Sequence, residues 1–217
     1  MKSDTAIKAD VDAELLWSPE IDETDIATKV TTGVVTLTGF VHSYFEKGRA
    51  ETIVKKVIGV TGVANDIEVR LGIGSIPTDP EIAREAVDTL RRECPWALET
   101  IRPAVHKGFV TLEGAVDWQY QREQAGSAVA KIKGVASVIN ALRIKPSVLP
   151  GDIKQRIEDA FRRSAAVDAS RISVEANGCE VILRGEVSSW SERDEAQATA
   201  WSAPGVTHVR NQLSIKI

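Results

Sequence analysis

The chain has 217 residues, 43% of them hydrophobic and 27% charged, a composition that suits a folded protein and excludes a disordered one. Its formal net charge of -4 gives no overall attraction to nucleic acid or to anionic membranes, so either contact would need a local basic patch. No apolar run approaches the roughly 18 residues that would span a bilayer, and the N-terminus lacks the apolar segment of a signal peptide.

The first predicted element is an amphipathic helix, because Ile7, Val11 and Leu15 recur at helical spacing. Two strands follow, joined by a tight turn at Thr32-Gly33. From Val35 to Thr38 apolar and polar residues alternate, which predicts one buried and one largely solvated sheet face.

A second helix and a last strand complete this segment. The sequence Ser43-x-x-Glu46 has the form of a capping box, and Ala50, Val54 and Val57 predict the buried stripe of the helix that follows. The closing strand is predicted at Ile67-x-Val69. The order αββαβ predicts an α+β fold in which two helices pack on a three-stranded mixed sheet.

The same pattern then recurs twice, which predicts three tandem copies of one module. Three glycines in Leu-x-Gly-x-Val segments serve as anchors: Gly39, Gly114 and Gly185. An alanine follows each anchor after 11 residues, a Gly-Val pair after 20 and an asparagine after 26, the asparagines being Asn65, Asn140 and Asn211. We expect domain boundaries at 1–72 (module 1), 78–146 (module 2) and 150–217 (module 3), with Gly/Pro-rich linkers at 72–80 and 146–151.

The later copies keep the buried stripes with small changes. The first helix buries Ile82, Ala86 or Val87, and Leu90 in module 2, and Ile153, Ile157 and Phe161 in module 3. The second helix of module 3 carries only alanines on its stripe, so we expect Trp190 or Trp201 to fill the space. Asn177-Gly178 predicts a type I′ hairpin turn. Gly178 lies one residue further from its anchor than Gly33 and Gly108 do, which predicts a one-residue length change in this hairpin.

The shared glycines and asparagines are predicted to be structural. A glycine near the end of a strand supplies an unusual φ or lets two backbones approach closely. The asparagines are expected to occupy a turn, or to bond nearby backbone, before the last strand. Gly59-Val60-Thr61-Gly62 has the G-x-x-G form of an RNA-gripping loop, but the other two copies lack it, so no nucleic-acid partner is expected.

These motifs resemble the BON domain family over Gly39–Val69, Gly114–Ile144 and Gly185–Ile215. The resemblance implies a non-catalytic, stress-associated module that contacts phospholipids or other proteins at membranes. Envelope-located members of the family carry a leader, which this sequence lacks. We therefore expect a cytoplasmic protein, or a periplasmic one only if a leader has been removed.

The sequence predicts neither catalysis nor a cofactor nor a metal site. The three histidines, His42, His106 and His208, stand at unrelated repeat positions without ligand spacing, and no nucleophile–base pattern occurs. Cys94 and Cys179 lie at non-equivalent positions, which favours two idle thiols over a disulfide.

One local patch predicts a binding site. In module 2, Arg91, Arg92 and Trp96 could contact lipid headgroups, with Arg162 and Arg163 as the equivalents of the arginine pair in module 3. Module 1 has Leu16 and Trp17 where the arginine pairs stand. The alternative, which the interleaved acidic residues favour, is an ordinary solvated helix face.

The leading hypothesis is thus a non-enzymatic, stress-associated protein that binds anionic phospholipid or a membrane-associated partner without spanning the membrane. The rival hypothesis is a cytoplasmic protein–protein adaptor or self-associating scaffold, which would dock partners on the solvated sheet faces and exposed tryptophans.

Overall fold

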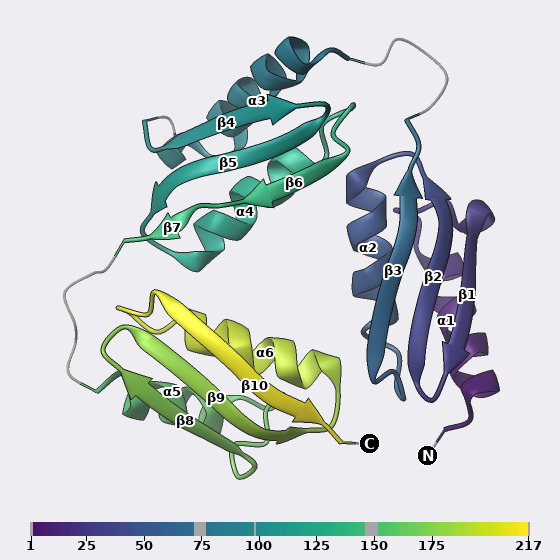
Figure 1. Ribbon diagram of the computed structural model, residues 1–217. Coiled ribbons are helices and arrows are strands. Elements are labelled where there is room, and N and C mark those ends of the chain that lie inside the picture. Colours follow the sequence, from purple (N-terminus) through teal and green to yellow (C-terminus); the bar gives the residue numbers. More distant parts are fainter. Residues whose placement is uncertain (1, 72–76, 98, 146–151, 217) are drawn as a thin grey trace. The chain divides into compact units, whose positions relative to one another are not determined.

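The computed structural model describes residues 2–71, 77–97, 99–145 and 152–216, and these form three modules of the predicted α+β kind (Figure 1). The predicted linkers lie largely outside the described residues. Each module is described by itself below.

The observed elements follow the order αββαβ in modules 1 and 3, and in module 2 the last strand of this order is divided into two. Module 1 comprises α1 (Asp4–Trp17), β1 (Ile26–Thr31), β2 (Val34–Val41), α2 (Tyr44–Val54) and β3 (Gly62–Val69). Module 2 comprises α3 (Asp79–Glu93), β4 (Ile101–His106), β5 (Phe109–Val116), α4 (Gln119–Ala130), β6 (Ser137–Asn140) and β7 (Arg143–Ile144). Module 3 comprises α5 (Ile153–Arg163), β8 (Ile172–Asn177), β9 (Glu180–Val187), α6 (Trp190–Trp201) and β10 (His208–Ile215). Short 3-10 helices precede β1 (Glu23–Asp25) and β4 (Pro95–Ala97).

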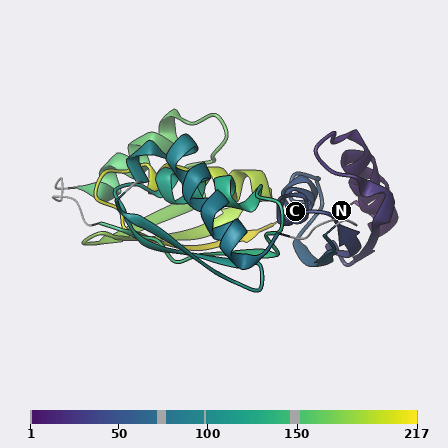
Figure 2. The same ribbon diagram turned by 90° about the horizontal axis from the view of Figure 1, so that it is seen from above.

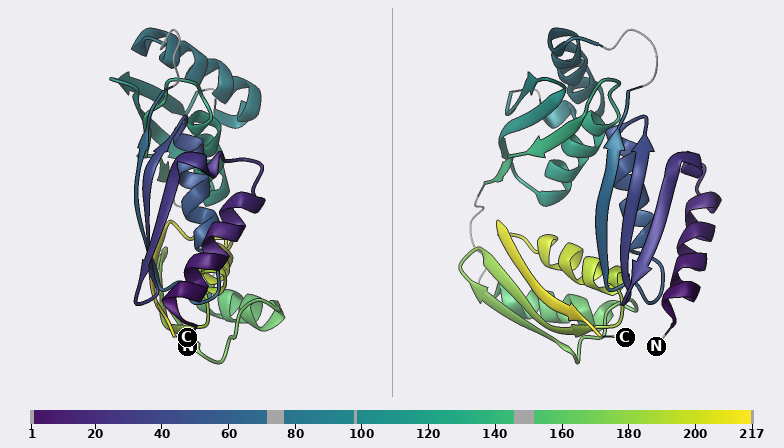
Figure 3. Two further views of the ribbon diagram at one scale, coloured as in Figure 1. Left: turned by 90° about the vertical axis from the view of Figure 1, so that its right-hand side faces the viewer. Right: turned by 45° about the vertical axis from the view of Figure 1, so that its right-hand side comes forward.

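Each sheet is mixed and is built around its middle strand. In module 1, β2 pairs antiparallel with β1 and parallel with β3, and the crossover between the parallel strands runs through α2. Module 3 repeats this arrangement with β9 in the middle. In module 2 the last strand is split, and both β6 and β7 pair with β5. Both helices of a module cover one face of its sheet, as the left view of Figure 3 shows for module 1 and Figure 2 for α3 in module 2.

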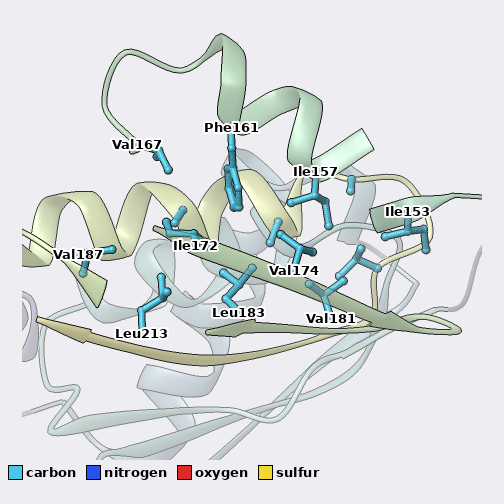
Figure 4. Packing of buried hydrophobic residues seen from close by; sticks show 14 residues of the cluster. Ile153, Ile157, Phe161, Val167, Ile172, Val174, Val181, Leu183, Val187 and Leu213 are labelled. Carbon is cyan, nitrogen blue, oxygen red and sulfur yellow. The ribbon is translucent and has the colours of Figure 1, made fainter. Parts of the chain in front are cut away.

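The predicted buried stripes form the cores. In module 3, Ile153, Ile157 and Phe161 of α5 meet Val181 and Leu183 of the middle strand (Figure 4). Trp201 is the tryptophan that packs against this core, beside the alanines of α6. The equivalent apolar positions in modules 1 and 2 are buried as well, so the predicted helix and strand faces are confirmed.

The anchor glycines lie where two stretches of backbone come close together. Gly39, Gly114 and Gly185 have φ values of +114°, +133° and +134°, a region that side chains disfavour. A Cβ on Gly39 would fall well inside 3.0 Å of the Asp25 carbonyl oxygen, just before β1. The equivalent carbonyls behind Gly114 and Gly185 belong to Thr100 and Arg171. The middle strand can therefore pair with the preceding strand at this point only because its residue here is glycine, which has no side chain.

The shared asparagines tie the last strand to the second helix. Asn65 Nδ2 donates to the Lys47 carbonyl at 2.9 Å, and Asn65 Oδ1 accepts from the Ile67 amide at 3.3 Å. Asn140 and Asn211 make the same two bonds in their modules. They bond nearby backbone as predicted, but they lie within the last strand rather than before it. This strand begins earlier than its apolar residues indicate because its parallel pairing extends back to Gly62.

The prediction for the third hairpin was wrong in two respects. Asn177 pairs with Glu180, so the central turn residues are Gly178 and Cys179, and the loop has the same two-residue length as Thr32-Gly33 in module 1. What differs is the position of the glycine within the turn. Only the first central residue has positive φ here, as in a type II′ turn, whereas Thr32 and Gly33 both have positive φ, as in a type I′ turn.

In modules 1 and 2, an aspartate carboxylate that the sequence analysis missed binds the turn amides of the hairpin. In module 2, Asp79 at the start of α3 accepts from the Lys107 and Gly108 amides at 2.7 and 2.9 Å, and Asp4 does the same for Thr32 and Gly33. Both turns force a non-glycine residue into positive φ, and the carboxylate compensates by binding the two turn amides. The equivalent position in the sequence of module 3 is Pro150, which has no carboxylate, and the hairpin of that module at Gly178-Cys179 has the other turn type.

Two glycines of module 1 give a matched test of the anchor position. Gly39→Ala should lower the free energy of unfolding of module 1 by about 2 kcal/mol or more, from backbone strain and the carbonyl clash. Gly48→Ala in α2, where a Cβ would meet nothing within 4 Å, should raise it by about 0.5–1 kcal/mol. Urea-dependent hydrogen exchange of module 1 amides measures both. Equal effects of the two substitutions would contradict the structural role of the anchor.

The Asp79 clamp predicts an acid-sensitive hairpin. Hydrogen bonds from the Gly108 and Lys107 amides lower the pKa of Asp79, so the folded state favours the charged carboxylate. The contribution to stability is therefore complete above the ordinary aspartate pKa of about 3.9 and is lost as the pH falls through the lower folded pKa. The Lys107 and Gly108 amide resonances, followed by NMR, should titrate with a midpoint below the ordinary value and lose that transition in Asp79→Asn. A midpoint at or above the ordinary value would refute the clamp.

Candidate functional site

The predicted arginine pair of module 2 lies in the last turn of α3. Ile82, Ala86 and Leu90 face the core, which leaves Arg91 and Arg92 exposed, each with 62% of its side chain accessible. Positive charge at this end of a helix also interacts favourably with the helix dipole. The pair is therefore well placed to meet an external anion.

Both arginines already have acidic neighbours on their own helix. Arg91 Nη1 lies 3.4 Å from Asp88 Oδ1. Arg92 Nη2 lies 3.9 Å from Glu85, 3.8 Å from Glu93 and 3.1 Å from Thr89 Oγ1. Exposed pairs of this kind contribute little to stability, so an anionic surface can compete for these side chains.

Module 2 also carries three aromatic side chains near the ends of its helices. Gln124, in the middle of α4, donates to the Glu93 carbonyl at 2.8 Å, so α4 lies beside the end of α3. Trp96 follows α3 in the 3-10 helix and is half-buried. Trp118 and Tyr120, at the start of α4, are 38% and 60% exposed. The sequence analysis missed these last two, although both stand at repeat positions where module 3 has only serine.

The corresponding corners of the other modules carry different side chains. In module 3, Arg162 bonds Asp159 at 2.7 Å, and the exposed Arg163 has no ion pair with any residue that the structure describes. In module 1, Leu16 and Trp17 end α1 with 70% and 86% of their surface exposed. The same helix end thus presents two arginines in two modules and two large apolar side chains in the third.

A groove of about 530 Å³ runs between α3 and α4 within module 2. Its floor includes Ile82 and Ile132, while acidic and basic residues alternate around its rim: Glu81, Glu85, Arg92, Glu93, Lys131 and Lys133. Opposite charges balance at this rim, so the groove offers no strong field for an ion of either sign.

The pKa shifts of the described ionisable groups all run in one direction for the carboxyls. Among the described residues, every carboxyl whose pKa shifts has it lowered, as in Glu81, where hydrogen bonds from the Thr78 amide and hydroxyl hold the pKa down. A general acid needs the opposite shift. Burial raises the pKa of the free Cys94 thiol, which disfavours the reactive thiolate.

The described parts of the chain also show neither a metal cluster nor a membrane span. Their His, Cys, Asp and Glu side chains do not gather in groups of three or more that could hold a metal ion. None of their helices is long and apolar enough to cross a bilayer.

Comparison with known proteins decides the family. The BON domain profile matches three stretches, 3–70, 78–146 and 151–217. The chain belongs to the BON domain family. Each of the three BON modules contains its own anchor glycine and its own asparagine tie, so the residues that carried the resemblance are those that build the fold.

One curated relative of these BON modules is the osmotically-inducible protein Y of Escherichia coli (strain K12). It is 36% identical over 149 residues, which cover 65% of this chain and 73% of the relative. Solved structures of CdsD, a structural protein of the type III secretion system of Chlamydia trachomatis, also match. The first covers 96% of this chain and 91% of its own, with 12% identity and a TM-score of 0.27. The C-terminal domain of CdsD gives 14% identity, a TM-score of 0.26 and 96% coverage of both chains.

Proposed function

We propose that this chain is a non-enzymatic, osmotic-stress-associated binding protein whose BON modules contact anionic phospholipid or a membrane-associated partner. The association with osmotic stress rests on the similarity to the osmotically-inducible protein Y. The observation that carries the lipid contact is the composition of the exposed helix ends, two of which carry arginine pairs and one of which carries Leu16 and Trp17.

These side chains have the properties that peripheral membrane contact requires. Each basic residue near an anionic surface contributes about 1 kcal/mol, and tryptophan favours the interface between headgroups and acyl chains. A single weak signal gives only marginal membrane binding, and each further basic or interfacial side chain strengthens it. Arg91, Arg92, Arg162 and Arg163 would contact headgroups, with Trp96 beside the first pair.

A second candidate function is a protein–protein adaptor or self-associating scaffold. The exposed aromatic residues Trp118 and Tyr120 favour it, because aromatic side chains are enriched in protein interfaces. An adaptor would bind its partner without regard to lipid charge, and this separates the two functions.

Co-sedimentation with vesicles tests the lipid contact. The chain should bind vesicles of anionic phosphatidylglycerol in phosphatidylcholine more tightly than vesicles of phosphatidylcholine alone, and the difference should shrink as salt increases. Arg91→Glu with Arg92→Glu should weaken anionic binding about thirtyfold, taking about 1 kcal/mol for each lost basic contact. The control, Lys29→Glu with Lys56→Glu, makes the same charge change at exposed positions in β1 and after α2, and should have a smaller effect. Binding that ignores lipid charge, or that responds equally to both double variants, would remove the headgroup contact.

A further inference from the structure

The hairpin turn of module 3 lacks the carboxylate that binds the turn amides in modules 1 and 2. In module 2, Asp79 accepts from the Gly108 amide at 2.9 Å, whereas the sequence of module 3 has Pro150 at the position of this aspartate. Within the described parts of the chain, the amides of Gly178 and Cys179 donate to no acceptor. A Cβ on the exposed Gly178 would meet nothing within 4 Å. The amide nitrogens of this turn are therefore unbound and accessible.

The residue before this glycine is an exposed asparagine, Asn177. Its side-chain amide forms no hydrogen bond with any residue that the structure describes. Attack of the Gly178 nitrogen on Asn177 Cγ would close a five-membered ring, and adjacent residues hold the two reacting groups at a high effective concentration. Glycine has no side chain that would shield this nitrogen. Ring closure requires the end of β8 to leave its strand conformation transiently, which a turn without a clamp allows more easily than a clamped one.

The other three asparagines of the chain are held away from this reaction. Asn65, Asn140 and Asn211 each donate from Nδ2 to a helix carbonyl and accept with Oδ1 from the amide two residues later. The attacking nitrogen is engaged as well in module 2, because the Ala141 amide donates to the Leu112 carbonyl at 2.9 Å. Among the described residues, Asn177 alone combines an unbound carboxamide with an unbound amide nitrogen beside it.

We propose that Asn177 is a site of spontaneous deamidation, a covalent modification confined to module 3. The Gly178 nitrogen loses its proton to a base in the solvent and attacks Asn177 Cγ. The bond from Cγ to Nδ2 breaks, and Nδ2 takes up a proton and leaves as ammonia. Water then hydrolyses the cyclic imide at either of its carbonyls, which gives aspartate or isoaspartate at position 177. Neither step changes an oxidation state, and solvent water is the only co-reactant.

The modification alters the pairing of the two strands that meet at this turn. Asn177 lies opposite Glu180 in the antiparallel register. A carboxylate at position 177 places like charges opposite each other, which destabilises a strand pair. The isoaspartate form also adds a methylene group to the backbone beside a turn of two residues. Deamidation therefore loosens the hairpin of module 3 with time and leaves the other two hairpins unchanged, and it is independent of the lipid contact proposed above.

Mass spectrometry of tryptic peptides after incubation of the full chain tests the site. Trypsin places the four asparagines in four different peptides, and residues 172–184 form the one with Asn177. At mildly alkaline pH this peptide should gain the mass that replaces an amide by a carboxylate, while the other three change little. The rate should rise with pH, because the nitrogen attacks only after it has lost its proton. Gly178→Ala should slow the reaction about tenfold, which corresponds to about 1.4 kcal/mol in the barrier, because its methyl group shields the nitrogen.

Lys107→Asn provides a matched control, because it places the same Asn-Gly sequence in the clamped turn of module 2. The Asp79 carboxylate binds the Gly108 amide proton and disfavours its loss. Position 107 should therefore react about tenfold more slowly than Asn177 in the same chain, again about 1.4 kcal/mol in the barrier. Adding Asp79→Ala should remove this difference. Circular dichroism verifies that each variant folds.

Two results would overturn the proposal. One is a 172–184 peptide that stays intact in the folded chain for the time in which the same chain, unfolded in urea, deamidates at Asn177. The other is equal deamidation of all four asparagines in the folded chain. Equal rates at positions 107 and 177 in the Lys107→Asn chain would overturn the argument that the missing carboxylate exposes this turn.

Discussion

The asparagine tie fixes the one strand of each module whose register no turn defines. The first two strands are joined by a two-residue hairpin, which sets their pairing. The last strand returns through a helix and pairs in parallel, so a slip by one residue would turn Ile67 from the core to the open face. Asn65 prevents this by bonding the helix backbone with Nδ2 and its own strand with Oδ1. The register of the last strand is therefore held by this half-buried amide together with the burial of Ile67.

The residues that the three modules share therefore have structural roles. The anchor glycine allows close approach of the backbone just before the first strand. The asparagine bonds the last strand to the second helix, and the apolar stripes fill the core. The modules diverge at the end of the first helix and on the open sheet face. The end of the first helix is the surface on which we place lipid contact.

The sequence predicts the fold well because periodicity reports which face of each element is buried. Phe161 and Leu183 are recognisable from spacing alone. The turn type of the third hairpin could not be predicted in this way. The Asn177-Gly178 pair suggests a type I′ turn, whereas the strand register places Gly178 and Cys179 at the centre of a type II′ turn. The Asp79 clamp joins residues far apart in sequence, although the repeat register aligns it with Asp4. The arginine pairs were identified from the sequence, and their binding role stays a prediction. The exposure of Phe109 and Ile139 required the structure, because alternation does not say which solvated positions stay uncovered.

Hydrogen–deuterium exchange of side-chain amides, observed by NMR, tests the asparagine tie most directly. The account predicts that the side-chain amide protons of Asn65, Asn140 and Asn211 exchange markedly more slowly than those of the exposed Asn177, because each donates to a helix carbonyl. Exchange of all four at the same rate would show that the last strand of each module is held by something else, and would contradict the account.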